Sequence, residues 1–239
     1  TNKLKPIPTE VLTPKEFIKY SVKIGRYSKF KPPEGVIFIY SRRFLKHIQE
    51  NHKVTRPSTF FGDLYLLKET GNKIGVYWCG IGAPVIASSM EEFIALGVKK
   101  FVSIGEAGTL QKTLKIKDLV VCDKAIRDEG TSHHYLKPSK YAYASKNMAK
   151  KIEKALDKLG QDYHVGASWT IDAPYRETVA EARKYQKEGV LTVEMEAAAL
   201  FAVGQYKKVE IGALFTVSDS LAELKWQPKF HLSNKNWEV

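Results

Sequence analysis

Apolar residues along the chain alternate between short runs with strand character and longer stretches with helical spacing. Apolar positions recur about every 3.6 residues in 42–50, 85–96, 144–159, 178–187 and 194–205, as in helices that bury one face. Runs rich in β-branched and aromatic residues cover 36–40, 64–68, 74–79, 100–104, 118–122, 163–169, 190–193 and 211–217. This alternation predicts an α/β protein with a twisted mixed β-sheet flanked by helices.

Two glycine-rich segments follow predicted strands. Residues 80–84 read GIGAP and lead into a predicted helix, and glycines followed by a proline at the first helical position are typical of a tight strand-to-helix turn. Residues 105–109 read GEAGT and follow the strand predicted at 100–104. We predict a second turn there.

The length and composition favour a single domain. The 239 residues are 44% apolar along their whole length, which is enough for one buried core over residues 1–239. No run of eighteen or more apolar residues occurs, and residues 1–6 lack the apolar core of a secretory signal. We therefore expect a soluble cytoplasmic protein without a membrane partner. Cys79 and Cys122 lie in short apolar runs, where reduced buried thiols are expected.

The formal net charge of +12 favours anionic partners, because a positive potential concentrates phosphate-bearing ligands around a protein. The lysines are dispersed, however, and in 144–159 they lie opposite an apolar stripe, as on a solvated helix face. No helix-turn-helix, zinc-finger or aromatic RNA-binding signature occurs, so no nucleic-acid partner is expected. His133 and His134 are adjacent in a segment predicted as extended, where neighbours point to opposite faces and cannot share one ion. Neither a metal nor another cofactor is expected.

Two carboxylates stand at positions where α/β proteins place their sites. Glu196 lies at the start of the helix predicted from residue 194, and Asp219 directly follows the last predicted strand. Ligands of open α/β sheets bind at the carboxyl ends of strands. Taken singly, each residue could instead be a partner of a helix dipole or a helix cap.

Together, the segments around these carboxylates resemble the nucleoside phosphorylase and nucleosidase superfamily. Residues 193–199 read VEMEAAA and residues 215–219 read FTVSD. The resemblance covers most of the chain: 80–84 looks like the family's first glycine turn and 104–108 like its second. Residues 125–134 are similar to bacterial uridine phosphorylases, whereas 170–175 match a base-stacking segment of the purine enzymes. The resemblance implies the nucleoside phosphorylase fold.

The resemblance also implies roles for individual residues. Glu196 would accept hydrogen bonds from the ribose 2′- and 3′-hydroxyls, Met195 would pack against the sugar, and Asp219 would protonate purine N7 as the bond to C1′ breaks. Such general acid catalysis contributes about 10²–10⁴-fold. Uridine phosphorylases lack this aspartate, so Asp219 favours a purine, whereas 125–134 favours uridine. Further substrate contacts are expected from Gly105, Glu106, Ala107, Thr170, Tyr175, Glu194 and Ser218.

The phosphate end departs from the family pattern. The first phosphate loop, usually Gly-Asp-Pro-x-Arg, is replaced by YSRRF at 40–44, which puts Phe44 at the arginine position. Ser103 stands where a second arginine is expected, and Glu106 replaces a small hydroxyl residue. Loss of a cation and gain of a carboxylate both oppose the binding of a dianion.

Three functions remain open at this stage. The first is a salvage phosphorylase with inorganic phosphate as co-substrate, in which Arg42 or Arg43 binds the phosphate with Ser103, helped by Arg56 or Arg176. In the second, Glu106 activates water and the protein is a nucleosidase; Glu106 could equally pair with a nearby arginine. The third is a non-catalytic nucleoside-binding member of the family.

The family also sets expectations for assembly and length. Its members are dimers to hexamers, so we expect a homo-oligomer. The sequence ends at 236–239, before the C-terminal helix that the family usually has. A truncated or unseen C-terminal helix is therefore expected.

Overall fold

A sheet of eleven strands organises the computed structural model, which describes residues 10–233. The expectation about a C-terminal helix lies outside the described residues. The strands are β1 (Gly35–Ile39), β2 (Val54–Thr55), β3 (Asp63–Leu67), β4 (Ile74–Trp78), β5 (Lys100–Thr109), β6 (Leu119–Asp128), β7 (Tyr141–Tyr143), β8 (Tyr163–Ile171), β9 (Thr192–Glu194), β10 (Glu210–Ser220) and β11 (Gln227–Pro228). Parallel and antiparallel pairs both occur, which confirms the predicted mixed sheet.

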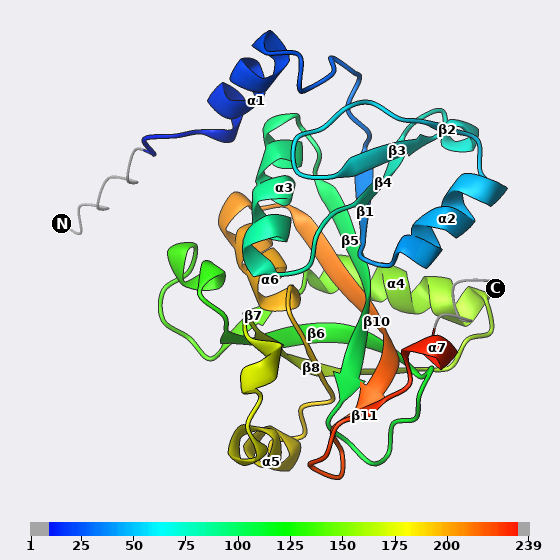
Figure 1. Ribbon diagram of the computed structural model, residues 1–239, viewed down its shortest axis with the longest axis vertical. Coiled ribbons are helices and arrows are strands. Elements are labelled where there is room, and N and C mark those ends of the chain that lie inside the picture. The colour runs from blue at the N-terminus through cyan, green and yellow to red at the C-terminus, as the bar shows by residue number, and fades with distance from the viewer. Residues whose placement is uncertain (1–9, 234–239) are drawn as a thin grey trace.

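Five of these strands close into a ring. The order β10-β6-β8-β9-β5 returns to its start because β5 also pairs with β10. β1 continues the sheet beyond β5 and runs parallel to both β5 and β4, and β3 and β2 complete this extension (Figure 1). β5 and β10 are parallel and end side by side, so their carboxyl ends meet at one place.

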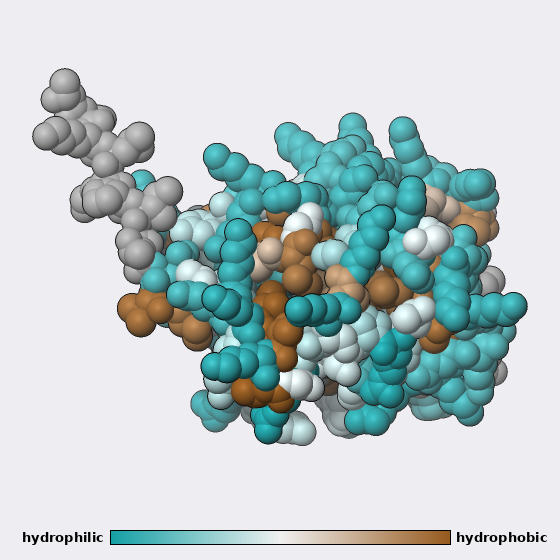
Figure 2. Space-filling model, turned by 90° about the horizontal axis from the view of Figure 1, so that it is seen from above, coloured by the Kyte–Doolittle hydropathy of each residue, from teal (hydrophilic) through white to brown (hydrophobic). Residues whose placement is uncertain are grey.

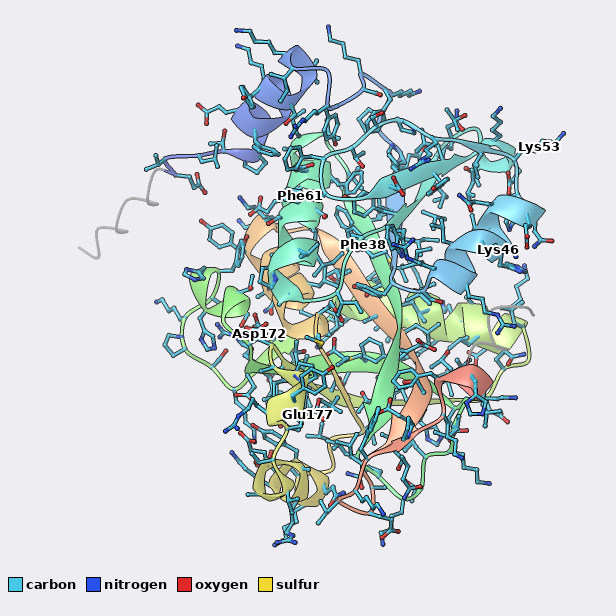
Figure 3. The ribbon with its side chains drawn as sticks, viewed as in Figure 1. Phe38, Lys46, Lys53, Phe61, Asp172 and Glu177 are labelled. Atoms are coloured by element: carbon cyan, nitrogen blue, oxygen red, sulfur yellow. The ribbon has the colours of Figure 1, made fainter. Side chains whose placement is uncertain are left out.

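Helices cover both faces of the sheet. They are α1 (Pro14–Lys23), α2 (Arg42–Asn51), α3 (Ala83–Ala95), α4 (Lys146–Lys158), α5 (Val179–Lys187), α6 (Ala197–Lys207) and α7 (Phe230–Ser233). Alternate side chains of β1 face opposite sides, as strand geometry requires. Phe38 packs in the core cluster of α3 and α6 (Figure 3), and Ile39 packs with α2. α4 packs in a separate cluster with β6.

The face of the molecule seen from above is mainly hydrophilic (Figure 2). In the face shown in Figure 2, long hydrophilic side chains surround separate apolar patches. Lys46 and Lys53 project away from the molecule near α2 (Figure 3). No helix in the described residues is both long and apolar enough to cross a membrane.

Several predicted elements differ from those observed. The segment 105–109 is not a turn: β5 runs through it, because β10 pairs with β5 from Glu210 and Lys100 to Ser220 and Thr109. For the same reason Asp219 lies inside β10 rather than after it. α6 begins at Ala197 instead of residue 194, with Glu196 as its N-cap.

Two further differences concern local signals. His133 and His134 belong to a 3-10 helix, η2 (Thr131–His134), rather than to an extended segment, and no group of three metal-ligating side chains occurs within 10–233. Helix α1 was not predicted, although Thr13, Pro14 and Glu16 form a capping box with proline at the helix start.

A buried acid in α3 makes stability depend on pH. Glu92 is 4% exposed, and its Oε1, the Tyr27 hydroxyl and the Ser21 hydroxyl have no hydrogen-bond partner within residues 10–233. Burial raises the pKa of Glu92 from 4.5 to about 7. The folded protein therefore holds this proton more tightly than the unfolded chain, so stability is highest below the unfolded pKa and falls as pH rises towards 7.

We expect Glu92→Gln to remove this loss. Because one pKa unit corresponds to about 1.4 kcal/mol, the variant should be up to about 3 kcal/mol more stable than the wild type at pH 8 and equal to it near pH 4. Urea unfolding at the two pH values measures this difference. Glu50→Gln, on the exposed face of α2, is the control and should leave the free energy of unfolding unchanged at both pH values. A Glu92→Gln variant without a pH-dependent difference would contradict the assignment.

Candidate active site

A cavity of about 700 Å³ lies at the carboxyl ends of β5 and β10. This volume is within the range of about 300–1,000 Å³ found for small-molecule sites. Its wall combines six parts of the chain: 40–44, Ile81, 104–108, 174–182, 193–196 and 218–230. The predicted site residues that line it are Gly105, Glu106, Ala107, Tyr175, Glu194, Met195, Glu196, Ser218 and Asp219.

Glu194 is held by the protein itself. Its Oε1 accepts hydrogen bonds from the hydroxyls of Thr170 (2.5 Å) and Ser168 (3.2 Å). Its Oε2 accepts from the backbone N–H groups of Glu196 (2.8 Å) and Ala197 (2.7 Å), at the start of α6. The carboxylate thus replaces the side-chain N-cap that α6 lacks and joins β8, β9 and α6. Thr170 lies behind Glu194, outside the cavity lining.

Glu196 is bound on its protein side and faces the cavity. Its Oε1 accepts from the backbone N–H of Gly82 (2.6 Å), at the start of α3, and its Oε2 from that of Met195 (3.3 Å). Gly82 has φ of +110°, a conformation that favours glycine. Burial, and then the charge of Glu194, raise the pKa of Glu196, while the N–H groups of Gly82 and Met195 favour its ionised form. Each oxygen can still accept a further hydrogen bond from a ligand.

Asp219 lies at a bulge in β10. The pairing with β5 shifts between Val217 and Asp219, and such bulges redirect side chains beside active sites. The Ser218 hydroxyl donates to Oδ1 (2.7 Å) and the Trp226 indole N–H donates to Oδ2 (2.9 Å). Gly108 faces this carboxylate: a Cβ added there would lie 2.9 Å from Oδ2, so a larger residue would displace Asp219.

The wall also contains groups that the sequence interpretation missed. Glu177 is half-buried and lines the cavity after η3 (Pro174–Arg176). Burial, and then the charge of Asp219, raise its pKa to about 7. Trp226, Lys225 and Phe230 enter from the chain that follows β10. Trp226 was recognisable as an aromatic residue close behind Asp219, whereas Glu177 carries no local signal.

The predicted phosphate-binding side chains do not meet in the cavity. Ser103 is buried and hydrogen-bonded to the Tyr40 hydroxyl (2.9 Å), behind the wall. The guanidinium of Arg42 lies over the Trp78 ring, 4.6 Å from its centroid, and Arg43 is exposed outside the lining. Neither arginine belongs to the lining of the cavity that the structure describes.

The two other arginines considered also lie elsewhere. Arg56 donates to Asp63 at 2.6 Å, and Arg176 is outside the lining. Lys225 is the one basic residue among the lining residues that the structure describes. The carboxylates around it belong to Glu106, Glu177, Glu194, Glu196 and Asp219. Within one chain, the cavity is acidic.

The segment similar to uridine phosphorylases has a structural role. Arg127 is buried, and its guanidinium donates to the hydroxyls of Ser132 (2.9 Å) and Ser139 (2.8 Å) and to the carbonyl of Lys137 (2.7 Å). These bonds hold the loop after β6 in place. Residues 125–134 are absent from the described lining of the cavity.

Comparisons with known proteins identify the family of this chain. The model of the phosphorylase superfamily matches residues 40–237. The chain is 31% identical to guanosine phosphorylase of Halorubrum lacusprofundi over 63% of each protein. It is also 31% identical to a DeoD-type purine nucleoside phosphorylase of Alkaliphilus metalliredigens over 76% of each protein. A uridine phosphorylase structure from Vibrio fischeri covers 87% of this chain and shares its fold, with a TM-score of 0.74, 24% identity and 86% of its own chain covered.

Proposed function

Because the chain belongs to the phosphorylase superfamily, we propose that it cleaves the N-glycosidic bond of a purine nucleoside with inorganic phosphate. The products would be the free base and ribose 1-phosphate. The observation that carries this proposal is the convergence of Glu196 and Asp219 on one cavity from β9–α6 and β10. The names of the guanosine and purine nucleoside phosphorylases similar to this chain support it.

The geometry suits a ribonucleoside. Glu196 has its inner lone pairs occupied by Gly82 and Met195, so its carboxylate is held in one orientation with its outer lone pairs towards the cavity. Two vicinal hydroxyls match these two oxygens. Tyr175 and Trp226 provide aromatic surface for the base, and Asp219 lies beside Trp226. Sugar and base therefore have separate binding groups.

A purine fits this wall better than uridine. Asp219 can serve N7, an atom that a pyrimidine lacks, and it lines the cavity. The competing signal, residues 125–134, is used to hold the loop after β6 through Arg127. The two sequence signals that pointed in opposite directions thus occupy different parts of the molecule.

Hydrolysis is the second candidate, and the position of Glu106 favours it. Its carboxylate stands in the wall where the family places a neutral residue, and no arginine belongs to the described lining. A carboxylate can act as a general base towards water. Phosphorolysis requires cations from elsewhere: a movement of Arg42 or Arg43, or a neighbouring subunit.

Assays with and without phosphate identify whether phosphate or water accepts the ribosyl group. We expect release of base from inosine and guanosine, with formation of ribose 1-phosphate, only when phosphate is present, and weaker cleavage of uridine. Chromatography of bases and sugars measures both products. Equal release without phosphate would establish a nucleosidase, and Glu106→Gln would then abolish it. Binding of nucleoside without any release would support the non-catalytic function.

We also propose a homo-oligomer of single-domain subunits, acting in nucleoside salvage in the cytoplasm. Two apolar side chains at the cavity support assembly: Ile81 is 65% exposed and Tyr175 is 100% exposed. A second copy of the chain placed against them would cover apolar surface and could bring cations to an acidic cavity. Light scattering of the purified protein gives the subunit number.

A further inference from the structure

Trp226 is an exposed residue whose polar atom is bound inside the cavity. Its side chain lines the cavity and the residue is 60% exposed, yet its indole N–H donates to Oδ2 of Asp219, a residue that is 7% exposed, at 2.9 Å. An indole N–H can only donate, and a carboxyl oxygen can accept in both the protonated and the ionised form. The bond therefore orients the carboxyl group whatever its charge.

The other hydrogen bond of Asp219 restrains it less. The Ser218 hydroxyl donates to Oδ1 at 2.7 Å, but it carries one hydrogen and can rotate, and the carbonyl oxygen of Ala107 lies 3.4 Å away as a second acceptor. The last torsion of an aspartate side chain is broad, so the carboxyl group can turn unless both of its oxygens are held. Trp226 provides the second restraint.

The hairpin that carries the indole is held in place by the rest of the fold. β11 pairs with the last residues of β10, and residues 221–226 connect the two strands (Figure 1). The backbone N–H of Leu221 donates to the carbonyl of Thr109 at the end of β5 (2.8 Å). The side-chain amide of Gln186 on α5 donates to the carbonyls of Leu221 (3.3 Å) and Ala222 (3.1 Å). The indole is therefore attached to a fixed backbone.

We propose that Trp226 is a positioning residue for the transfer of a proton from Asp219 to the leaving purine, an inference that rests on the proposed function. As the bond between C1′ and N9 breaks, its electron pair goes to the base, a proton moves from Asp219 to N7, and a phosphate oxygen forms the new bond to C1′. The indole N–H takes no part in these bond changes and keeps the carboxyl group in one orientation. Because a small displacement of a reacting group lowers the rate, loss of this N–H slows the proton transfer.

A substrate that needs no proton isolates this role. In 7-methylinosine, N7 carries a methyl group and the base already bears a positive charge, so its departure needs no acid. Trp226→Phe keeps an aromatic ring and loses the N–H. We expect this variant to lower kcat for inosine about 3- to 10-fold and kcat for 7-methylinosine less than about twofold. Steady-state kinetics of the wild type and the variant measure the ratio of the two kcat values.

Trp169 provides a matched control, because it makes the same kind of bond elsewhere. Its indole N–H donates to Asp128 at 2.8 Å, and neither residue belongs to the described lining of the cavity. Trp169→Phe should leave the ratio of kcat values at the wild-type level, although this substitution of a buried side chain lowers stability. Thermal unfolding checks that each variant is folded at the assay temperature.

The kinetic constants separate this role from two simpler ones. An unchanged ratio of kcat values in Trp226→Phe, or an equal fall of the ratio in Trp169→Phe, would overturn the inference. A rise in KM for both nucleosides with unchanged kcat would also overturn it, because Trp226 would then only bind the base. Wild-type protein that cleaves neither nucleoside would instead reject the proposed function.

Discussion

The Asp219→Asn variant is expected to lose about 10²–10⁴-fold in kcat for inosine, the usual contribution of a general acid. An amide cannot give a proton to N7, and a purine anion is a poor leaving group. Cleavage of 7-methylinosine should be much less affected, since no proton is required. Steady-state kinetics with the two substrates give the comparison directly.

The bonds of Asp219 suggest the control. Asparagine cannot accept the hydrogen bonds of Ser218 and Trp226 on both sides, because one of its ends is an NH₂ donor. Trp226→Phe removes one of these donors and keeps the carboxylate. We expect this variant to lose much less activity than Asp219→Asn. If Asp219→Asn reduced inosine turnover by less than about threefold, Asp219 would not be the proton donor.

The second large effect is expected at the sugar. Glu196→Gln should lower kcat/KM for inosine about 100-fold, because hydrogen bonds to charged groups contribute about 1.5–3 kcal/mol each and the ribose offers two hydroxyls. The preference for inosine over 2′-deoxyinosine should shrink in the same variant. Parallel kinetics with both nucleosides measure this preference.

Glu194→Gln is the matched control two residues away. Its amide would point a donor at hydroxyl or N–H groups that now donate to Glu194, so we expect a loss of about 1–3 kcal/mol of stability. The preference for ribose over deoxyribose should persist. A Glu196→Gln variant with unchanged discrimination between the two sugars would mean that Glu196 does not bind the hydroxyls.

The sequence predicted the main helices and strands because their signals are local. Ser41 caps α2, Thr178 caps α5, and the apolar periodicity marks their buried faces. The prediction of a turn at 105–109 was wrong because a glycine can mark either a turn or a place in a strand where another group approaches closely. Here Gly105 leaves room for the Tyr40 ring and Gly108 for Asp219, while pairing with β10 keeps the backbone extended. Neither contact is visible from the neighbouring sequence.

Only part of the candidate site could be predicted from the sequence, for a similar reason. Glu196 and Asp219 lie in segments that resemble the family, and both line the cavity. Arg42 lies over the Trp78 ring, and Ser103 is hydrogen-bonded to the Tyr40 hydroxyl. Both partners are distant in the sequence and become neighbours only in the folded protein. Glu177 and Trp226 lie on different connecting segments and line the same cavity as Asp219, so only the assembled fold brings the three to one site.

The closed ring of strands limits how this site can change during evolution. Sliding β10 along β5 by one residue would also shift its pairing with β6, and through β8 and β9 the shift would return to β5. The spacing between Glu196 and Asp219 is therefore a property of the whole ring and is hard to alter by single substitutions. New base preferences are expected to arise in 174–179 and 221–230, which contact the cavity without belonging to the ring. Sugar recognition and base selection can thus diverge at different rates in the same protein.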